Sequence, residues 1–190
     1  FIFLGMVGII DPPRSEVYDA IQKCQDAGIR VKMITGDQQM TAQAIGEELD
    51  ITSPHIEAVS GSRLLELDDE AMRHTAQNTS IFSRVSPDQK MLIVTALQDD
   101  GEVVAMTGDG VNDAPALSRA NIGISMGIAG TDVAKDASDM VLQDDNFANI
   151  VNAVEEGRKI YTNIRNFVRY QVSTNVAAVA LLILATLVFD

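Results

Sequence analysis

Apolar and polar segments alternate along the first three quarters of the chain in the order of a parallel α/β protein. Short apolar runs at Phe1–Ile10 and Ile29–Ile34 predict strands. Thr35-Gly36-Asp37 follows the second run directly, and a helix is expected from Gln39 to Leu49. Strands that alternate with helices indicate a parallel sheet with covering helices. A helix between the two strands is predicted by four apolar residues at helical spacing: Val17, Ala20, Ile21 and Cys24.

The alternation resumes after a polar, irregular segment at residues 52–79. That segment shows helical patches at Leu64–Glu66 and Asp69–Thr75 but no recognisable chemistry, so we expect a surface insertion. The later strands are expected at Ile81–Ser83, Val103–Thr107, Ile122–Met126 and Met140–Leu142, and the later helices at Pro87–Gln98 and Asn112–Arg119. The predicted fold class is α/β, with a Rossmann-like parallel sheet and flanking helices.

One long helix is predicted from Asn146 onward. It first carries an apolar stripe, and beyond Tyr170 it is apolar around its whole circumference. The run Val176–Phe189 spans only about 21 Å, less than the roughly 30 Å core of a bilayer, and Val172–Asn175 lengthens it. The sequence allows a buried core helix or hairpin, or a transmembrane helix of which only the start is included. Basic residues just before the run favour the membrane interpretation and place that side in the cytoplasm.

Charge separates the two parts of the chain. The formal net charge of the 190 residues is −13, yet residues 151–190 carry four basic and three acidic residues. An acidic protein lacks the basic surface that phosphate backbones require, so nucleic-acid binding is not expected. The single cysteine, Cys24, excludes a disulfide within the chain and fits a reducing compartment.

The most specific motif is the nine-residue string from Thr107 to Pro115, TGDGVNDAP. It places Asp109 and Asp113 just after a predicted strand, at the sheet edge where parallel sheets bind ligands. Carboxylate oxygens suit Mg²⁺, which also keeps water and phosphate ligands. Glycines on both sides of Asp109 allow close approach of the backbone. The alternative is a polar turn with an aspartate cap.

Two further segments could bind an anion. Thr35-Gly36-Asp37 offers a hydroxyl and a glycine N–H at a helix start, a common anion site. Lys90 lies in the first turns of a predicted helix, where its charge would strengthen a phosphate pocket. Each has an ordinary alternative, a capped turn for the first and a solvated lysine for the second. Arg84, just after a strand, is ambiguous in the same way.

Together these segments resemble three of the four motifs of the haloacid dehalogenase superfamily: a threonine after a strand, a lysine, and a paired-acid loop. The resemblance to P-type ATPases within that superfamily is closer. It rests on TGDGVNDAPAL, MITGD, the DPPR run at 11–14, GTDVAKDASDMVLQDDNF at 130–147 and EEGRKIYTNIRNFVRYQVSTN at 155–175. It covers nearly the whole chain, and residues 52–79 are the least distinctive.

The resemblance implies three domains and a set of roles. Residues 1–147 would form the carboxyl-terminal portion of a phosphorylation domain, 148–171 a stalk helix, and 172–190 the start of a transmembrane helix. Asp109 would ligate Mg²⁺, and Asp113 would help hold the metal and the loop. The phosphoryl group of ATP would be bound by Thr35, Gly36, Lys90 and Asn112. Asp37 and Arg84 would approach the nucleotide, on its ribose side.

The family phosphorylates the aspartate of a DKTGT motif, and this sequence contains no such string. The resemblance therefore implies that the rest of the same pump is the partner: an upstream phosphorylated aspartate, nucleotide-binding and actuator domains, and other membrane helices. It also implies a multi-pass protein of the cell membrane, with residues 1–171 on the cytoplasmic side. The chain alone is expected to be inactive.

The soluble motifs resemble the type II pumps, which include calcium pumps. In two-site calcium pumps a glutamate follows the membrane asparagine by three residues, whereas here Ala178 follows Asn175. This resembles single-site calcium or manganese pumps, so the expected cargo is Ca²⁺ or Mn²⁺, with sodium and protons left open. Asn175 could face the ion path or serve as a packing amide.

Two other functions stay open at the level of sequence. A soluble phosphatase of the same superfamily would need its own nucleophile, and Asp11 is followed by Pro12-Pro13 in place of the remaining motif. A non-catalytic module could instead use the acidic loop to bind Ca²⁺ or Mg²⁺.

Overall fold

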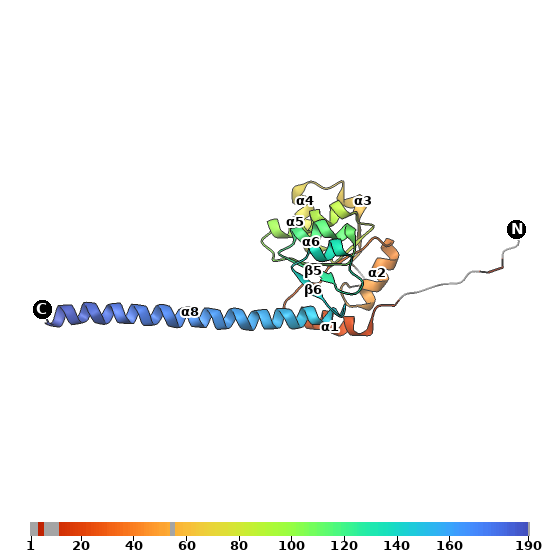
Figure 1. Cartoon of the computed structure of the whole chain (residues 1–190). Helices are drawn as coiled ribbons and strands as arrows, with labels where there is room; N and C mark the ends of the chain where they lie inside the picture. The colour runs from red at the N-terminus through yellow and green to blue at the C-terminus, as the bar shows by residue number, and fades with distance from the viewer. Residues whose placement is uncertain (1–3, 6–11, 54–55, 190) are drawn as a thin grey trace. The chain divides into compact units, whose positions relative to one another are not determined.

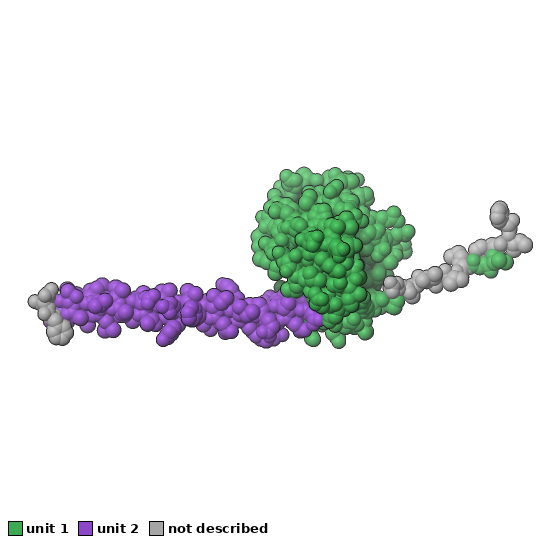
Figure 2. Space-filling view, in the orientation of Figure 1, with its two compact units in different colours: residues 1–148 green, residues 149–190 purple. Residues whose placement is uncertain are grey.

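The computed structural model describes residues 4–5, 12–53 and 56–189. Most of the strand predicted at Phe1–Ile10 lies outside these residues. The chain divides into two compact units, residues 1–148 and 149–190, coloured separately in Figure 2. The boundary drawn from sequence between a stalk and a membrane segment at 171/172 stays a prediction.

Within the residues that the structure describes, the first unit contains two parallel sheets, each of three strands. The first has the order β1-β3-β2 and the second β4-β5-β6. The strands of the first are β1 (Met33–Ile34), β2 (Val59–Ser60) and β3 (Ile81–Ser83). Those of the second are β4 (Ala105–Gly108), β5 (Ile122–Met126) and β6 (Met140–Leu142). β1 and β4 are therefore edge strands of the sheets that the structure assigns, and the prediction of parallel strands is confirmed.

Helices connect these strands, as expected from the alternating pattern (Figure 1). The crossovers and flanking helices are α1 (Ser15–Asp26), α2 (Gln39–Glu48), α3 (Gly61–Leu64), α4 (Asp69–Asn78), α5 (Pro87–Asp99), the 3-10 turn η1 (Val111–Asp113), α6 (Ala114–Arg119) and α7 (Asp132–Asp136). On α1, Cys24 is a buried free thiol, and burial raises its pKa. The helix predicted at Asn112–Arg119 is divided into η1 and α6.

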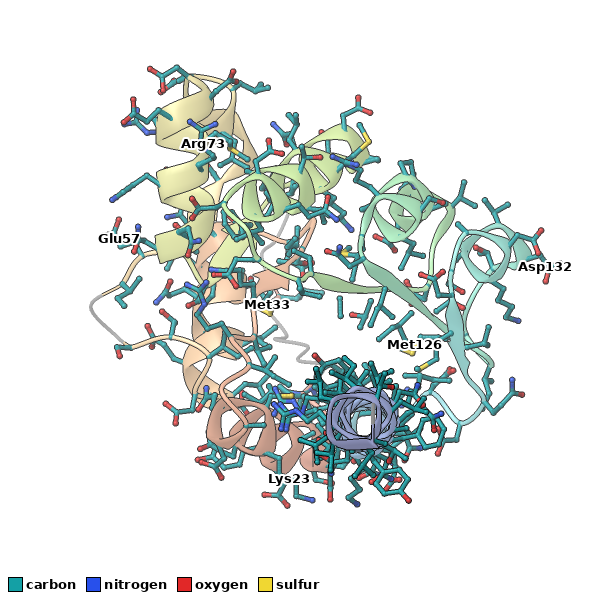
Figure 3. All side chains as sticks on the ribbon, turned by 90° about the vertical axis from the view of Figure 1, so that its left-hand side faces the viewer. Lys23, Met33, Glu57, Arg73, Met126 and Asp132 are labelled. Atoms are coloured by element: carbon teal, nitrogen blue, oxygen red, sulfur yellow. The ribbon has the colours of Figure 1, made fainter. Side chains whose placement is uncertain are left out.

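Helix α5 belongs to both halves of the first unit. It packs against α4 and against α6. Its Ile93 lies in a core with Phe82 of β3, whereas the next residue, Val94, lies in a second core with Leu117 of α6. In Figure 3, Met33 marks the first sheet and Met126 the second. One helix therefore links the packing of the two sheets.

The prediction that residues 52–79 form a surface insertion is wrong. The segment supplies β2, which pairs with β3 in the register Val59↔Phe82. Ala76 of α4 is fully buried, and Leu64 of α3 lies with it in the core around Phe82. β2 has only two residues and the segment is rich in charge, so no alternation long enough to indicate a strand is present.

Two other elements differ from expectation. Of the apolar run Ile29–Ile34, only Met33–Ile34 forms strand, because β1 pairs with the short β3 alone. The helix α7 was not predicted, since its five residues are shorter than two turns. Its start is nevertheless capped, as the Thr131 hydroxyl accepts a hydrogen bond from the Ala134 N–H at 3.3 Å.

The second unit consists of the long helix α8 (Ala148–Phe189), whose first residue belongs to the first unit. Its 42 residues correspond to a length of about 63 Å. The Asn146 side chain accepts a hydrogen bond from the Ala148 N–H at 2.9 Å at its start. Among the described residues it is the one helix long and apolar enough to cross a membrane. Its most apolar part is not buried, which favours the membrane interpretation over a buried core helix.

Candidate functional site

The acidic loop follows β4 and leads through η1 into α6. Its Asp113 is 7% exposed, and its Oδ1 accepts a hydrogen bond and ion pair from Lys90 Nζ at 2.6 Å. The side chains of Lys90 and Asp113 are 15% and 11% exposed, so the pair is largely shielded from water. Lys90 comes from α5 and Asp113 from η1. The pairing therefore fixes the acidic loop against the helix that both cores share.

The second oxygen of Asp113 holds the loop backbone. Oδ2 accepts hydrogen bonds from the N–H groups of Gly110 at 3.1 Å and Asp109 at 3.3 Å. Gly108 is needed for this arrangement, because a Cβ there would lie 2.8 Å from Asp113 Cγ. The Asp113 carboxylate thus accepts hydrogen bonds from three donors, the Lys90 ammonium and two backbone amides. The Asp109 side chain is exposed at the carboxyl end of β4.

Lys90 is positioned by the start of α5. The Ser86 side chain accepts a hydrogen bond from the Gln89 N–H at 3.4 Å, and the Gln89 side chain accepts one from the Ser86 N–H at 2.9 Å. Pro87 occupies the first turn, where its missing N–H is not needed. This capping box fixes where the helix begins, and so directs Lys90, one turn later, toward the acidic loop.

A second group of predicted residues lies at the carboxyl ends of β1 and β3. The Thr35 hydroxyl donates to Asp37 Oδ2 at 2.8 Å and accepts from the Asp37 N–H at 3.1 Å. The Arg84 N–H donates to the Asp37 carbonyl at 3.1 Å. Arg84 has a φ of 52°, an uncommon value for a residue with a side chain. Gly36 lies within this turn and is exposed.

The structure thus brings the predicted residues into two groups, Lys90 with the acidic loop and Arg84 with the Thr35 turn. No hydrogen bond or ion pair between described residues joins the two groups. Asn112, in η1, is exposed, and no described hydrogen bond engages its side chain. The roles assigned to these residues from sequence stay predictions.

The donors of the acidic loop partly fit a magnesium ion. Within the described ranges no three aspartate, glutamate, histidine or cysteine side chains come together to hold a metal. Asp113 already pairs with Lys90, so the exposed Asp109 is the carboxylate best placed to take a cation. Mg²⁺ commonly binds through one or two carboxylates and completes its shell with water and phosphate oxygens. The loop therefore suits Mg²⁺ that arrives with a phosphate, and not an all-protein cage.

Two residues that form hydrogen bonds beside this loop, Thr131 and Asp145, were not singled out from sequence. The Thr131 N–H donates to the Asp109 carbonyl at 2.8 Å. The Asp145 carboxylate accepts from the N–H groups of Ile128 at 2.9 Å and Ala129 at 2.8 Å. Both residues lie in the string 130–147 that carries part of the family resemblance, but hydrogen bonds to distant backbone groups leave no periodic signal.

Comparison with known proteins agrees with this arrangement. Residues 2–121 match the haloacid dehalogenase-like hydrolase family. The chain belongs to that family. The parallel strands, the flanking helices and the loops at their carboxyl ends are the features expected of the fold in this family.

The chain is also similar to calcium-transporting ATPases. It is 52% identical over 184 residues to one from Bacillus subtilis strain 168, covering 97% of this chain and 21% of the relative. It is 51% identical over 185 residues to calcium-transporting ATPase type 2C member 1 of Homo sapiens, covering 97% of this chain and 20% of the relative. The chain therefore spans about a fifth of the length of these curated relatives.

Solved structures give the same family relationship. A zinc-transporting PIB-type ATPase in the E2.Pi state matches with a TM-score of 0.64 and 30% identity, covering 82% of this chain and 21% of that chain. The catalytic domain of the CPx-ATPase CopB-B matches with a TM-score of 0.56 and 26% identity, covering 75% of this chain and 45% of that one. The resemblance to P-type ATPases is confirmed.

Proposed function

We propose that this chain is part of an ATP-driven cation pump and that it binds the transferred phosphoryl group together with Mg²⁺. The observation that carries the proposal is the acidic loop, in which Asp113 pairs with Lys90 and holds the backbone on both sides of the exposed Asp109. Identity of 50% or more to calcium-transporting ATPases across 97% of the chain supports it.

The chemistry is the transfer of the ATP γ-phosphoryl group to an aspartate carboxylate. ADP leaves, and water then hydrolyses the acyl phosphate to restore the carboxylate and release phosphate. Such transfer depends mainly on positioning and on neutralising oxygen charge. Mg²⁺, bound through Asp109 and assisted by Asp113, would supply positive charge to the phosphoryl oxygens. The remaining charge neutralisation falls to groups of this chain.

Four groups are proposed to bind the phosphoryl oxygens. The Thr35 hydroxyl and the Gly36 N–H lie in the turn after β1, while Asn112 and Lys90 flank the acidic loop. Lys90 is placed one turn inside α5, whose amino end also favours negative charge. Donors fixed in advance at such a site stabilise developing charge without reorganisation. Asp37 and Arg84, exposed beside the Thr35 turn, are proposed to bind the ribose side of the nucleotide.

The phosphorylated aspartate is proposed to come from another segment of the same polypeptide, along with the nucleotide-binding and actuator domains and the other membrane helices. β1 and β4, which precede the two loops of the site, are both edge strands. Edge strands carry unpaired backbone groups that can accept a further strand. A strand paired there in parallel, as the other strands of both sheets are, would bring its own carboxyl end to the same edge as Thr35 and Asp109.

Helix α8 is proposed to begin as a stalk and to enter the membrane, with residues 1–171 on the cytoplasmic side of a multi-pass protein of the cell membrane. Four basic residues precede its most apolar part: Arg158, Lys159, Arg165 and Arg169. Positive residues favour the cytoplasmic side. The relatives named as calcium-transporting support Ca²⁺ as cargo, or Mn²⁺, with Asn175 facing the ion path.

The test uses a full-length protein that carries this sequence, incubated with Mg²⁺ and ATP labelled at the γ-phosphorus. Acid-stable label on an aspartate is expected in the parent and in an Asp136→Asn control, and a loss of about 100-fold or more in Asp109→Asn. The 190-residue chain alone is expected to incorporate none. Label in the chain alone, or full labelling in Asp109→Asn, would contradict the proposal. Phosphatase turnover by the chain alone that depends on Asp11 would favour a soluble phosphatase instead.

A further inference from the structure

A short stretch that we call the bridge segment, residues 127–131, lies between the acidic loop and the turn that follows β6. It follows β5 and ends at the start of α7. At its far end the Thr131 N–H donates to the Asp109 carbonyl at 2.8 Å. At its near end the Gly127 N–H donates to the Leu142 carbonyl at 2.8 Å. The bridge segment therefore contacts the candidate magnesium loop on one side and the exit of β6 on the other.

One carboxylate holds the middle of the bridge segment. Asp145 directs its two oxygens to two successive amides, those of Ile128 at 2.9 Å and Ala129 at 2.8 Å. These hydrogen bonds, with Ile128 first, hold the pKa of Asp145 below its ordinary value of 3.8, assisted by the charge of Arg14. The carboxylate is thus ionised at neutral pH, and hydrogen bonds to a charged acceptor are stronger than neutral ones.

The backbone of Asp145 is in an uncommon conformation. Its φ is 54°, in the left-handed region that is unfavourable for a residue with a Cβ, least so for aspartate and asparagine. The conformation closes the turn in which the Asp145 N–H donates to the Leu142 carbonyl at 3.2 Å. The Arg14 guanidinium donates to the Asp145 carbonyl at 3.2 Å. An uncommon backbone conformation of this kind suggests that the direction in which the Asp145 side chain points has a role.

The two glycines of the bridge segment pack closely against neighbouring backbone. A Cβ on Gly127 would lie 2.6 Å from the Leu142 carbonyl oxygen, and a Cβ on Gly130 would overlap the Met126 carbonyl. Only Gly130 separates the amide held by Asp145 from Thr131. The amides held by Asp145 and the amide bonded to Asp109 therefore lie within four consecutive residues of the backbone. On its other side, Asp145 directly precedes Asn146, which caps the first residue of α8.

We propose that Asp145 is a positioning residue for the acidic loop: by holding the bridge segment at two amides it fixes the Asp109 backbone and ties that loop to the turn that begins α8. The inference deepens the proposed function, on which it rests. It assigns to one carboxylate the connection between the site that would bind magnesium and phosphate and the helix that would enter the membrane.

Amide hydrogen exchange of the whole 190-residue chain in detergent micelles, resolved by residue, tests the proposal. Asp145→Gly removes the carboxylate, and glycine accepts the left-handed backbone without strain, so any loss of protection in this variant comes from the missing side chain. We expect the Ile128 and Ala129 amides to exchange about tenfold faster, and the Thr131 amide about fivefold faster, from the loss of charged hydrogen bonds. No hydrogen bond described in the structure joins Thr131 to Asp145, so the response of the Thr131 amide distinguishes positioning from a purely local role.

Two variants serve as comparisons. Asp145→Asn keeps one acceptor oxygen and should fall between the parent and Asp145→Gly at all three amides. Asp136→Asn removes the same charge from α7, where the side chain is exposed, and should leave the three amides unchanged. If Asp145→Gly loses protection throughout the core around Phe82, Asp145→Asn carries the test alone. Unchanged exchange at Thr131 in a folded Asp145 variant overturns the proposal.

A Mg²⁺ titration on the same samples separates this inference from the proposed function. The Asp109 amide signal should shift with Mg²⁺ and inorganic phosphate in the parent, and about threefold to tenfold more Mg²⁺ should be needed in Asp145→Gly. A parent that does not respond to Mg²⁺ contradicts the proposed function, while the exchange rates at Thr131 still decide whether Asp145 positions the loop.

Discussion

Lys90 Nζ lies 2.6 Å from Asp113 Oδ1, and the two residues come from different elements, α5 and η1. The pair is the most shielded of the ion pairs found among the described residues. Its lysine meets a carboxylate that also holds two backbone amides. Removing the lysine would leave the Asp113 carboxylate poorly solvated and without its ionic partner. The same pair therefore contributes both to the stability of the fold and to the geometry of the acidic loop.

Lys90→Met should therefore destabilise the chain. Removing one partner of a buried ion pair usually costs 3–5 kcal/mol, and the partial exposure here lowers the expected loss in free energy of unfolding to about 2–4 kcal/mol. Lys23→Met, at an exposed position on α1, is the matched control and should change little. Urea unfolding of the three proteins measures the difference, and equal stability of both variants would show that Asp113 does not depend on Lys90.

Gly108 and Gly110 flank Asp109 but should respond differently to alanine. A Cβ on Gly108 would lie 2.8 Å from Asp113 Cγ, whereas a Cβ on Gly110 would lie 3.5 Å from Asp113 Oδ2, an ordinary contact. Gly108→Ala should cost about 1–3 kcal/mol by overpacking and move Asp113 away from Lys90. Gly110→Ala should fold with nearly parental stability. Thermal unfolding checks both, and a larger loss in Gly110→Ala would contradict the loop geometry.

Lys32 gives the chain a pH dependence in alkaline solution. Its pKa is lowered from 10.5 to about 8, first by burial and then by the charge of Arg30, against an opposing effect of Glu102. Between pH 8 and 10.5 the unfolded chain keeps a proton that the folded chain has lost. The free energy of unfolding contributed by Lys32 should therefore rise with pH across that window.

The contribution of Lys32 can be isolated by difference. Urea unfolding of the parent and of Lys32→Met, measured from pH 7 to 10, should show a smaller rise or a steeper fall with pH in the variant. Lys23→Met should follow the parent at every pH. Lys32→Met also loses the hydrogen bonds to the carbonyls of Gln77 and Thr79, so it should be less stable at neutral pH. Parallel pH curves for parent and variant would show that Lys32 keeps its ordinary pKa.

The division of α8 at residues 171/172 can be tested because the chain contains no tryptophan. A single tryptophan introduced by Leu182→Trp should emit at shorter wavelength in lipid vesicles and be quenched by brominated acyl chains. One introduced by Tyr161→Trp should emit as if in water and escape quenching. Equal quenching at both positions would contradict the proposed boundary.

Sequence was most informative where one short segment contains both the chemistry and its structural context. The acidic loop follows an apolar strand and precedes a helix, so the sequence alone places Asp109 and Asp113 at a sheet edge. Lys90 could be singled out from its position in the first turns of a predicted helix and from the resemblance to the family's lysine motif. Its pairing with Asp113, 23 residues away, could not be predicted, because nothing local distinguishes a paired lysine from a solvated one.

Short elements and long-range hydrogen bonds were beyond prediction. β2 has two residues, too few for an alternation of polar and apolar positions, yet it pairs with β3 and belongs to the sheet. Asp145 could be placed only in a polar string before α8, since its partners are the backbone amides of Ile128 and Ala129. Those amides carry no residue-specific signal, so the geometry of the bridge segment emerges only from the folded chain.

The adjacent residues Ile93 and Val94 of α5 lie in two different cores. If the chain were divided just after α5, near residue 101, the first fragment would expose the face of α5 that carries Val94. The second fragment would lack the helix that covers its sheet. Neither fragment should fold alone, but the two should recognise each other through that helix. The same arrangement makes the exposed turn around Gly101 a suitable place to split the chain into two fragments of a reporter. When the fragments reassemble, the Lys90–Asp113 ion pair forms again, and its formation would report reassembly.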